Sequence, residues 1–242
     1  MVKNIKLDIQ YDGTDFNGSQ IQDSGRTVQG ELEKSLSNLT KEKIKALFSG
    51  RTDSGVHAKH QVVNFKTEST IPPEKFYLAL KSFLPNDILV LSSEEVSIDF
   101  NSRFDARNRE YRYFISNRRD LFNRKYTLFV KDFDIDKANE LNELFIKNKN
   151  YRSFCSYKSS EKTFLCDIRD IGWKKSNDNI YFEVKANRYL HNMIRILVST
   201  YLEYVTDRLS YDDVKRIINA KDRKFAPQTI SPIGLFLWKI EY

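Results

Sequence analysis

The chain has 242 residues, 40% hydrophobic and 30% charged, which is typical of a folded globular protein and excludes a disordered one. Its 40 Lys and Arg exceed its 33 Asp and Glu, giving a net charge of +7. This charge favours a polyanionic partner, but only weakly, because many basic enzymes bind no nucleic acid. The sequence has no apolar run near the roughly 18 residues of a membrane span and no signal-peptide pattern. Its two cysteines, Cys155 and Cys166, favour a reducing cytoplasm over a disulfide framework or a zinc site.

The first hundred residues alternate between strand and helix patterns. Apolar and polar residues alternate over residues 3–11, which predicts a strand that ends in the turn Asp12-Gly13. Helical spacing of Val28, Leu32, Leu36 and Leu39 predicts an amphipathic helix over residues 27–39. The other expected elements are strands over residues 44–49, 61–66 and 88–91, a polar loop over 50–55, and a helix from Pro72-Pro73 to about residue 84.

The regular pattern breaks around residues 100–108, which places the junction between an N-terminal half, residues 1–103, and a C-terminal half, residues 104–242. Neither half has a glycine-rich phosphate loop after its first strand, which disfavours a nucleotide-cofactor fold. We expect an α+β fold of two similar mixed α/β halves with largely antiparallel sheets. The second half is predicted to contain strands over residues 110–116, 167–174, 180–186 and 235–242, a hairpin-like loop over 175–179, and helices over 135–145, 189–205 and 211–220.

A glycine-bounded loop carries the clearest chemical signal: Gly50-Arg51-Thr52-Asp53-Ser54-Gly55-Val56-His57-Ala58. Glycines let a backbone turn sharply or approach a ligand closely, and loops held by rigid strands often carry catalytic groups. Arg51 would help to keep the Asp53 carboxylate ionised. The same two residues also fit a plain structural ion pair, so their pattern alone leaves catalysis open.

This loop resembles the signature loop of the TruA-type tRNA pseudouridine synthases, and further similarities to that family follow in the same order along nearly the whole chain. The resemblance implies the pseudouridine synthase fold, in which the two halves are joined around a central RNA-binding cleft. The similar stretches are Tyr11-Asp12-Gly13 with Phe16 and Gly18, Thr27-Val28-Gln29 with Leu32-Glu33, Gln61-Val62-Val63-Asn64-Phe65, Leu84-Pro85-Asn86-Asp87-Ile88, Phe104-Asp105-Ala106-Arg107, Tyr111-Arg112-Tyr113, His191-Asn192-Met193-Ile194-Arg195, Ala226-Pro227 and Gly234-Leu235.

The resemblance implies an isomerase (an intramolecular transferase) that converts uridine to pseudouridine in the anticodon stem-loop of tRNA, at the family's positions 38, 39 and 40. The reaction breaks the bond from ribose C1′ to uracil N1, turns the base and rejoins it through C5, so no cofactor and no metal are implied. A cytoplasmic homodimer that binds tRNA across both subunits is also implied. Two alternatives stay open: a paralogue that acts on another RNA such as ribosomal RNA, and a non-catalytic RNA-binding protein on the same fold.

The family's roles transfer to four residues. Asp53 matches the catalytic aspartate, which acts by covalent attack on the sugar or base or by removing the C2′ proton to form a glycal-like intermediate. Arg195 matches the arginine that pairs with this aspartate; its own pattern also fits a snorkelling side chain at the edge of an apolar helix. Tyr111 matches the tyrosine that packs against the target base, although its strand pattern alone favours one more inward aromatic. Arg51 matches a residue that fills the space of the flipped base or holds a phosphate.

Three positions depart from the family's usual pattern, and they leave the range of substrates open. Ser19 stands where an aromatic residue, commonly Trp, is usual; Arg152 precedes Ser153-Phe154 where an acidic residue is common; and Lys162-Thr163 replaces an Arg-Thr pair. His57 is expected to be structural or to face the RNA. The candidate phosphate contacts, each also consistent with a solvated surface charge, are Arg107, Arg109, Arg112, Arg118, Arg119, Arg124 and Lys125.

Overall fold

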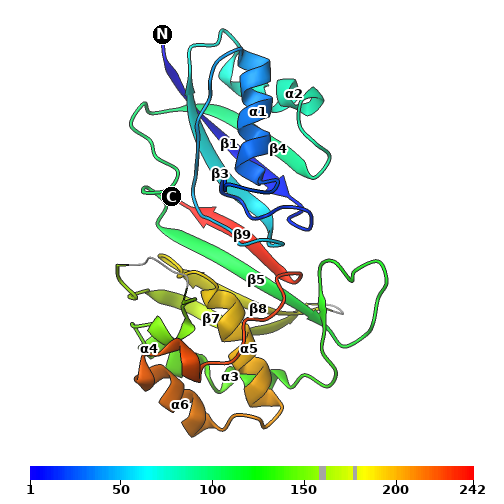
Figure 1. Cartoon of the computed structure of the whole chain (residues 1–242), viewed down its shortest axis with the longest axis vertical. Helices are drawn as coiled ribbons and strands as arrows, with labels where there is room; N and C mark the ends of the chain where they lie inside the picture. Colours follow the sequence, from blue (N-terminus) through cyan, green and yellow to red (C-terminus); the bar gives the residue numbers. More distant parts are fainter. Residues whose placement is uncertain (158–161, 177–178) are drawn as a thin grey trace. The chain divides into compact units, whose positions relative to one another are not determined.

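The structure, a computed structural model, describes residues 1–157, 162–176 and 179–242 and divides into two compact units. Unit 1 comprises Met1–Arg109 and Phe236–Tyr242, and unit 2 comprises Glu110–Leu235. Each unit combines a sheet with helices (Figure 1), so the expected mixed α/β fold with largely antiparallel sheets is confirmed. Within the described part of the chain, no helix is both long enough and apolar enough to cross a membrane.

Unit 1 contains β1 (Lys3–Tyr11), α1 (Val28–Thr40), β2 (Ala46–Phe48), β3 (His57–Thr67), α2 (Phe76–Ala79), β4 (Ile88–Val96) and β9 (Leu235–Glu241). Its strand order is β4-β1-β3-β9, and β2 pairs with β3. β1 is antiparallel to β3 and β4, whereas β9 runs parallel to β3 and pairs His57 with Phe236. The last strand of the chain therefore lies next to the strand that follows the Asp53 loop.

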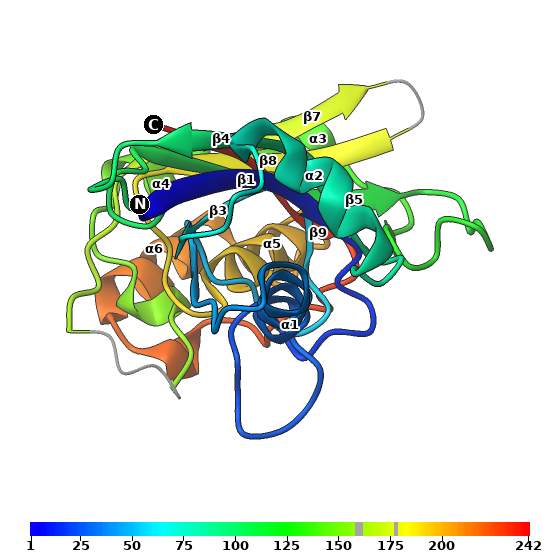
Figure 2. The ribbon, with the colours of Figure 1, turned by 90° about the horizontal axis from the view of Figure 1, so that it is seen from above.

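The core of unit 1 lies between one face of this sheet and α1 (Figure 2). Ile5, Leu7 and Ile9 of β1 are fully buried, as are Leu32 and Leu36 of α1. Each such side chain contributes about 1.5–3 kcal/mol through burial. The strand ends are thus anchored in a packed interior, and the loops that leave them start from fixed positions.

Unit 2 contains β5 (Asn108–Ser116) from Glu110 onward, β6 (Leu128–Phe129), α3 (Ile135–Asn139), α4 (Asn142–Lys147), β7 (Ile168–Ser176), β8 (Asn179–Ala186), α5 (Met193–Val205) and α6 (Tyr211–Ala220). Its strand order is β5-β8-β7, with β6 beside β5. The rings of Trp173, Phe182 and Tyr201 form one cluster with centroids 5.2 to 6.0 Å apart. This cluster joins α5 to the sheet through aromatic packing.

Several expected elements differ in the structure. The helix expected over residues 72–84 is a 3-10 turn at Pro73–Lys75, the short α2 and a second 3-10 turn at Leu80–Ser82. The helix expected over residues 135–145 is split into α3 and α4, and α5 begins only at Met193, because Asn192 adopts a left-handed φ of 63°. Apolar spacing continues across such breaks, so periodicity does not detect them. Residues 177–178 of the loop expected at 175–179 lie outside the described residues.

Candidate active site

Asp53 lies in the loop that connects β2 to β3 in unit 1. Its side chain is half-buried, and that of Arg51 is exposed. Between them, Thr52 is buried, with 7% of its surface exposed. The loop is therefore anchored to the interior at Thr52, and the functional groups on either side of this anchor have access to solvent.

Two residues hold Thr52. The hydroxyl groups of Tyr11 and Thr52 are 2.8 Å apart. The Thr52 N–H donates to Ser19 Oγ at 2.8 Å, and the Ser19 N–H donates back to the Thr52 carbonyl at 3.1 Å. Burial raises the pKa of Tyr11 to about 12, so its phenol is neutral at physiological pH. The residue that precedes Asp53 is thus bonded through its side chain and both of its backbone polar groups.

The second part of the loop is fixed by the segment that follows β1. The Phe16 carbonyl accepts from the Gly55 N–H at 3.3 Å and from Ser54 Oγ at 3.2 Å. The Val56 N–H donates to the Asp53 carbonyl at 3.2 Å, which closes a turn with Gly55 at a φ of 76°. A single hydrogen bond contributes only about 0.5–1.5 kcal/mol, so it is the set of contacts that orders the loop.

The start of the loop is held by Gln61 of β3. Its amide nitrogen donates to the Gly50 carbonyl at 2.8 Å, and its amide oxygen accepts from Ser49 Oγ at 2.5 Å. From the other side, the guanidinium of Arg109 donates to the Ser49 carbonyl at 2.7 and 3.0 Å. Arg109, expected as a candidate phosphate contact, therefore supports the loop within unit 1.

Two glycines allow the backbone after β1 to pack directly on the loop. A Cβ atom on Gly13 would lie 2.0 Å from the Val56 oxygen, and one on Gly18 would lie 2.9 Å from the Thr52 oxygen. Only glycine permits such an approach without a backbone shift. The motif around Tyr11, Gly13 and Gly18 is therefore the structural partner of the Asp53 loop, although it lies about 40 residues earlier in the chain.

His57 is buried at the end of the loop, with 1% of its surface exposed. Its Nδ1 accepts the Gly13 N–H at 3.0 Å, and its ring stacks on Phe236 of β9 with centroids 4.5 Å apart. Of the two roles expected for His57, these contacts favour the structural one.

The other two expected site residues lie in unit 2. Arg195 is half-buried in the first turn of α5, where its Nε donates to the Ile230 carbonyl at 2.7 Å and its Nη1 donates to Asn192 Oδ1 at 3.1 Å. Tyr111 of β5 is 6% exposed and packs edge-on against Tyr189, with ring centroids 5.1 Å apart. These contacts lie within unit 2, and the expected pairing of Arg195 with Asp53 stays a prediction.

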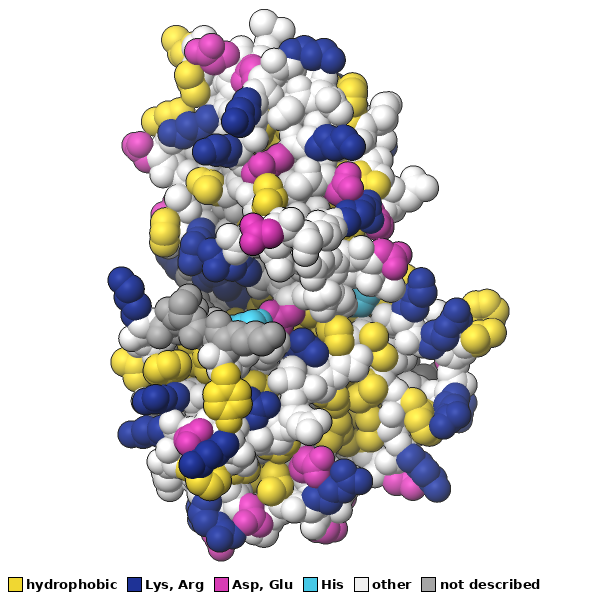
Figure 3. Space-filling model, viewed as in Figure 1, with side chains coloured by type: hydrophobic (Ala, Val, Ile, Leu, Met, Phe, Trp, Pro, Cys, Tyr) yellow, Lys and Arg dark blue, Asp and Glu magenta, His cyan; other side chains and the backbone are white. Residues whose placement is uncertain are grey.

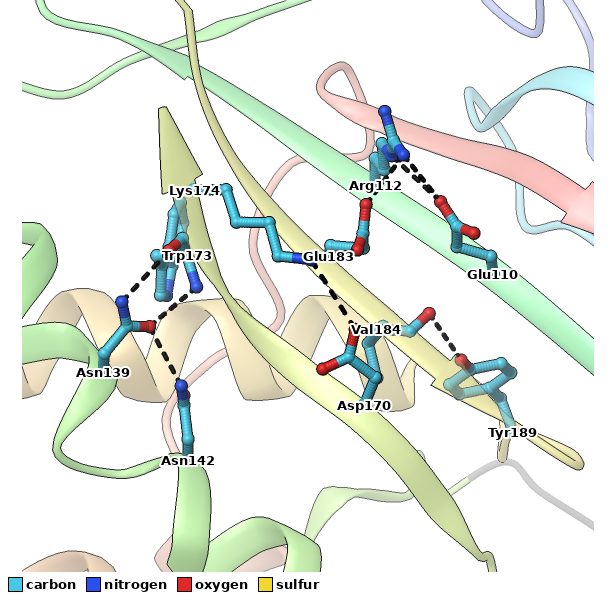
Figure 4. A network of polar contacts seen from close by, with 10 residues as sticks. All are labelled: Glu110, Arg112, Asn139, Asn142, Asp170, Trp173, Lys174, Glu183, Val184 and Tyr189. Carbon is cyan, nitrogen blue, oxygen red and sulfur yellow. Dashed lines mark hydrogen bonds and ion pairs between the residues drawn. The ribbon is translucent and has the colours of Figure 1, made fainter. Parts of the chain in front are cut away.

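Arg112, another candidate phosphate contact, belongs to an ion-pair network on the sheet of unit 2 (Figure 4). Its guanidinium pairs with Glu110 at 2.9 Å and with Glu183 at 2.8 Å, and Glu183 also pairs with Lys174 at 2.5 Å. Burial, and then the nearby charge of Glu183, raises the pKa of Glu110. This network gives Arg112 a structural role.

The remaining basic candidates are on the surface. Figure 3 shows Lys and Arg side chains interspersed with Asp and Glu on the face that it presents. In unit 2, the segment before β6 adds exposed apolar side chains, with Leu121 65% exposed and Phe122 87% exposed. Five of the seven candidates are exposed and therefore accessible to a phosphate: Arg107, Arg118, Arg119, Arg124 and Lys125.

Comparison with known proteins identifies the class. A sequence model of a family described as tRNA pseudouridine synthase matches residues 9–105 and 144–242. A protein of Clostridium acetobutylicum named tRNA pseudouridine synthase A is 40% identical over 244 residues, covering 100% of both chains. Proteins of the same name are 41% identical in Caldicellulosiruptor saccharolyticus, over 100% of both chains, and 38% identical in Bacillus subtilis, over 98% of both. The chain belongs to the tRNA pseudouridine synthase family, which confirms the resemblance found in its motifs.

Proposed function

We propose that the protein isomerises uridine to pseudouridine in tRNA without a cofactor, with Asp53 as the catalytic carboxylate. The observation that carries this proposal is the half-buried Asp53 on a loop whose backbone is fixed before and after it. A fixed carboxylate with access to solvent suits a group that must meet a nucleotide in one geometry. Membership of the family over the whole chain supports the reaction.

The proposed targets are uridines of the anticodon stem-loop, at positions 38, 39 and 40. The relatives' name, tRNA pseudouridine synthase A, supports tRNA as the substrate, and the motif resemblance supports these positions. A stacked uridine must be extruded to react, which costs a few kcal/mol. The exposed arginines would offset this cost by binding phosphates of the RNA, and such contacts do not depend on the base sequence.

Each of the other site residues has a proposed part in the reaction. Arg195, held by Ile230 and Asn192, pairs with the Asp53 carboxylate that acts in either chemical route. Tyr111 packs against the uracil ring while the base turns. Arg51, whose side chain is exposed, acts on the RNA by holding a phosphate or filling the space that the flipped base leaves. The enzyme is proposed to work in the cytoplasm as a homodimer, which light scattering of the purified protein tests.

The experiment is site-by-site mapping of pseudouridine after incubation of the purified protein with unmodified RNA. Transcripts of tRNA with uridine at positions 38, 39 and 40 are compared with transcripts that carry cytidine there, and with ribosomal RNA fragments. The proposal expects pseudouridine only at the three anticodon-arm positions. Product confined to ribosomal RNA would show a paralogue with another target. Binding of RNA without any product would show a non-catalytic RNA-binding protein.

A further inference from the structure

Ser19 connects a helix end to the catalytic loop. It is 1% exposed, and its hydroxyl accepts the Thr52 N–H at 2.8 Å. Its backbone N–H donates to the Thr52 carbonyl, and its own carbonyl accepts the Gln29 N–H of α1 at 2.9 Å. One buried residue therefore joins the first turn of a packed helix to the peptide that precedes Asp53.

The bond from Thr52 requires an acceptor on residue 19. Thr52 is 7% exposed, and a backbone N–H in the interior needs a partner. An indole offers only a donor and a phenyl ring offers neither donor nor acceptor, whereas a hydroxyl accepts. The Ser19 hydroxyl thus makes a contact that an aromatic side chain at this position could not make.

We propose that Ser19 is a positioning residue, which fixes the Thr52 peptide and thereby the direction in which Asp53 presents its carboxylate. This inference rests on the proposed function, because it assigns Asp53 the chemical step. Ser19 is buried and acts through Thr52, so its loss should lower kcat and leave the KM for tRNA nearly unchanged. Displacement of a reacting group by about 1 Å can cost about a hundredfold in rate, so a partly released peptide is expected to cost about tenfold.

The test compares two serine-to-alanine variants of unit 1. Ser19→Ala should lower kcat about tenfold, keep KM within about twofold, and speed hydrogen exchange at the Thr52 amide. Ser35→Ala is the matched control: Ser35 is 2% exposed, and its hydroxyl lies within hydrogen-bond distance of the Glu31 and Phe83 carbonyls, at 2.8 and 3.0 Å. The control should keep wild-type kcat and wild-type exchange at Thr52, even if it unfolds at a lower temperature.

Unchanged kcat in a folded Ser19→Ala protein would overturn the proposal. If that variant does not fold, Ser19→Cys replaces it, because a thiol is a weaker acceptor of similar size. The cysteine variant should fold with a kcat between those of the wild type and a tenfold-impaired enzyme. Failure of both variants to fold, or wild-type kcat in the cysteine variant, would assign Ser19 a purely structural role. If the wild type makes no pseudouridine, the proposed function fails, and exchange at Thr52 still shows whether Ser19 orders the loop.

Discussion

The hydroxyl groups of Tyr11 and Thr52 lie 2.8 Å apart in the interior of unit 1. Tyr11 is the last residue of β1, and Thr52 directly precedes Asp53. A strand end that is buried against the core therefore fixes the residue next to the proposed catalytic carboxylate. Because burial raises the pKa of Tyr11 to about 12, this contact stays between neutral hydroxyls throughout the physiological range.

The raised pKa of Tyr11 predicts a stability effect at high pH. Its usual value is 10.0 and its folded value about 12, so the folded state holds the proton more tightly than the unfolded state. The associated stability is fully present below pH 10 and is lost as the pH rises from about 10 to about 12. The free energy of unfolding of the wild type should therefore fall relative to that of Tyr11→Phe, by on the order of 1 kcal/mol at pH 11. Urea unfolding of both proteins from pH 8 to 11 measures this difference, and a constant difference would contradict the assignment.

A methyl group at Gly18 should disturb the loop and the reaction together. Gly18 has a φ of 81°, and a Cβ there would meet the Thr52 oxygen at 2.9 Å. Gly18→Ala is expected to cost about 1–2 kcal/mol of stability through its left-handed backbone and to lower kcat at least tenfold by displacing Thr52.

Gly25→Ala is the matched control for Gly18→Ala. Gly25 has a similar φ of 87°, but the atoms nearest to its Cβ would be those of the Asn17 side chain, at 3.0 Å. This variant should lose a similar amount of stability, measured by thermal unfolding, and keep wild-type kcat. Equal kcat in both variants would show that close packing on Thr52 does not matter for the reaction.

Arg195 is predicted to act through its charge. Arg195→Gln and Arg195→Lys both lose the planar fork that donates to Ile230 and Asn192, so both should unfold at similarly lowered temperatures. Only the lysine retains a positive charge. We expect kcat of the glutamine variant to fall at least a hundredfold, which corresponds to an activation free energy raised by about 2.7 kcal/mol. The lysine variant should have a kcat between those of the glutamine variant and the wild type.

The control for these variants is Arg208→Gln, just beyond the end of α5, where Arg208 is 72% exposed and pairs with Glu203. Its pseudouridine formation should equal that of the wild type. Full activity in Arg195→Gln would remove Arg195 from the proposed site.

Tyr111 is predicted to act through its ring. Stacking of a base on an aromatic side chain contributes about 1–3 kcal/mol. Tyr111→Phe should therefore retain kcat within about threefold, whereas Tyr111→Leu should lower it at least tenfold. Tyr111 is buried and packs against Tyr189, so rates are compared well below each variant's unfolding temperature. A leucine variant as active as the phenylalanine variant would leave Tyr111 as an ordinary core residue.

Elements with a strong local signal could be predicted from the sequence. The alternation of apolar and polar residues predicts the observed bounds of β1, Lys3–Tyr11, because a repeat of two residues can be recognised within a segment of nine residues. The helix Tyr211–Ala220 also has its predicted bounds, and it begins with a capping box between Ser210 and Asp213. The start of α5 could not be predicted in this way, because the left-handed turn at Asn192 leaves the apolar spacing around it unchanged.

The motif of the Asp53 loop indicates the loop itself, but no local pattern indicates the residues that hold it. Tyr11 and Ser19 contact Thr52 across 41 and 33 positions of sequence, and such pairing depends on how β1 and β3 align. From the sequence, Ser19 is only a departure from the family pattern. The return of β9 to pair with β3 at His57 is likewise a long-range contact that no local pattern indicates.

Replacing the Asp53 carboxylate by an amide of the same shape tests the central claim most directly. The measurement is pseudouridine formation in tRNA by Asp53→Asn, beside Asp99→Asn, which removes one charge from an exposed position of the same unit. We predict no product from Asp53→Asn, a tRNA Kd within about twofold of the wild type because phosphate contacts dominate binding, and normal turnover by Asp99→Asn. Pseudouridine formation by Asp53→Asn at the wild-type rate would contradict the assignment of the catalytic carboxylate.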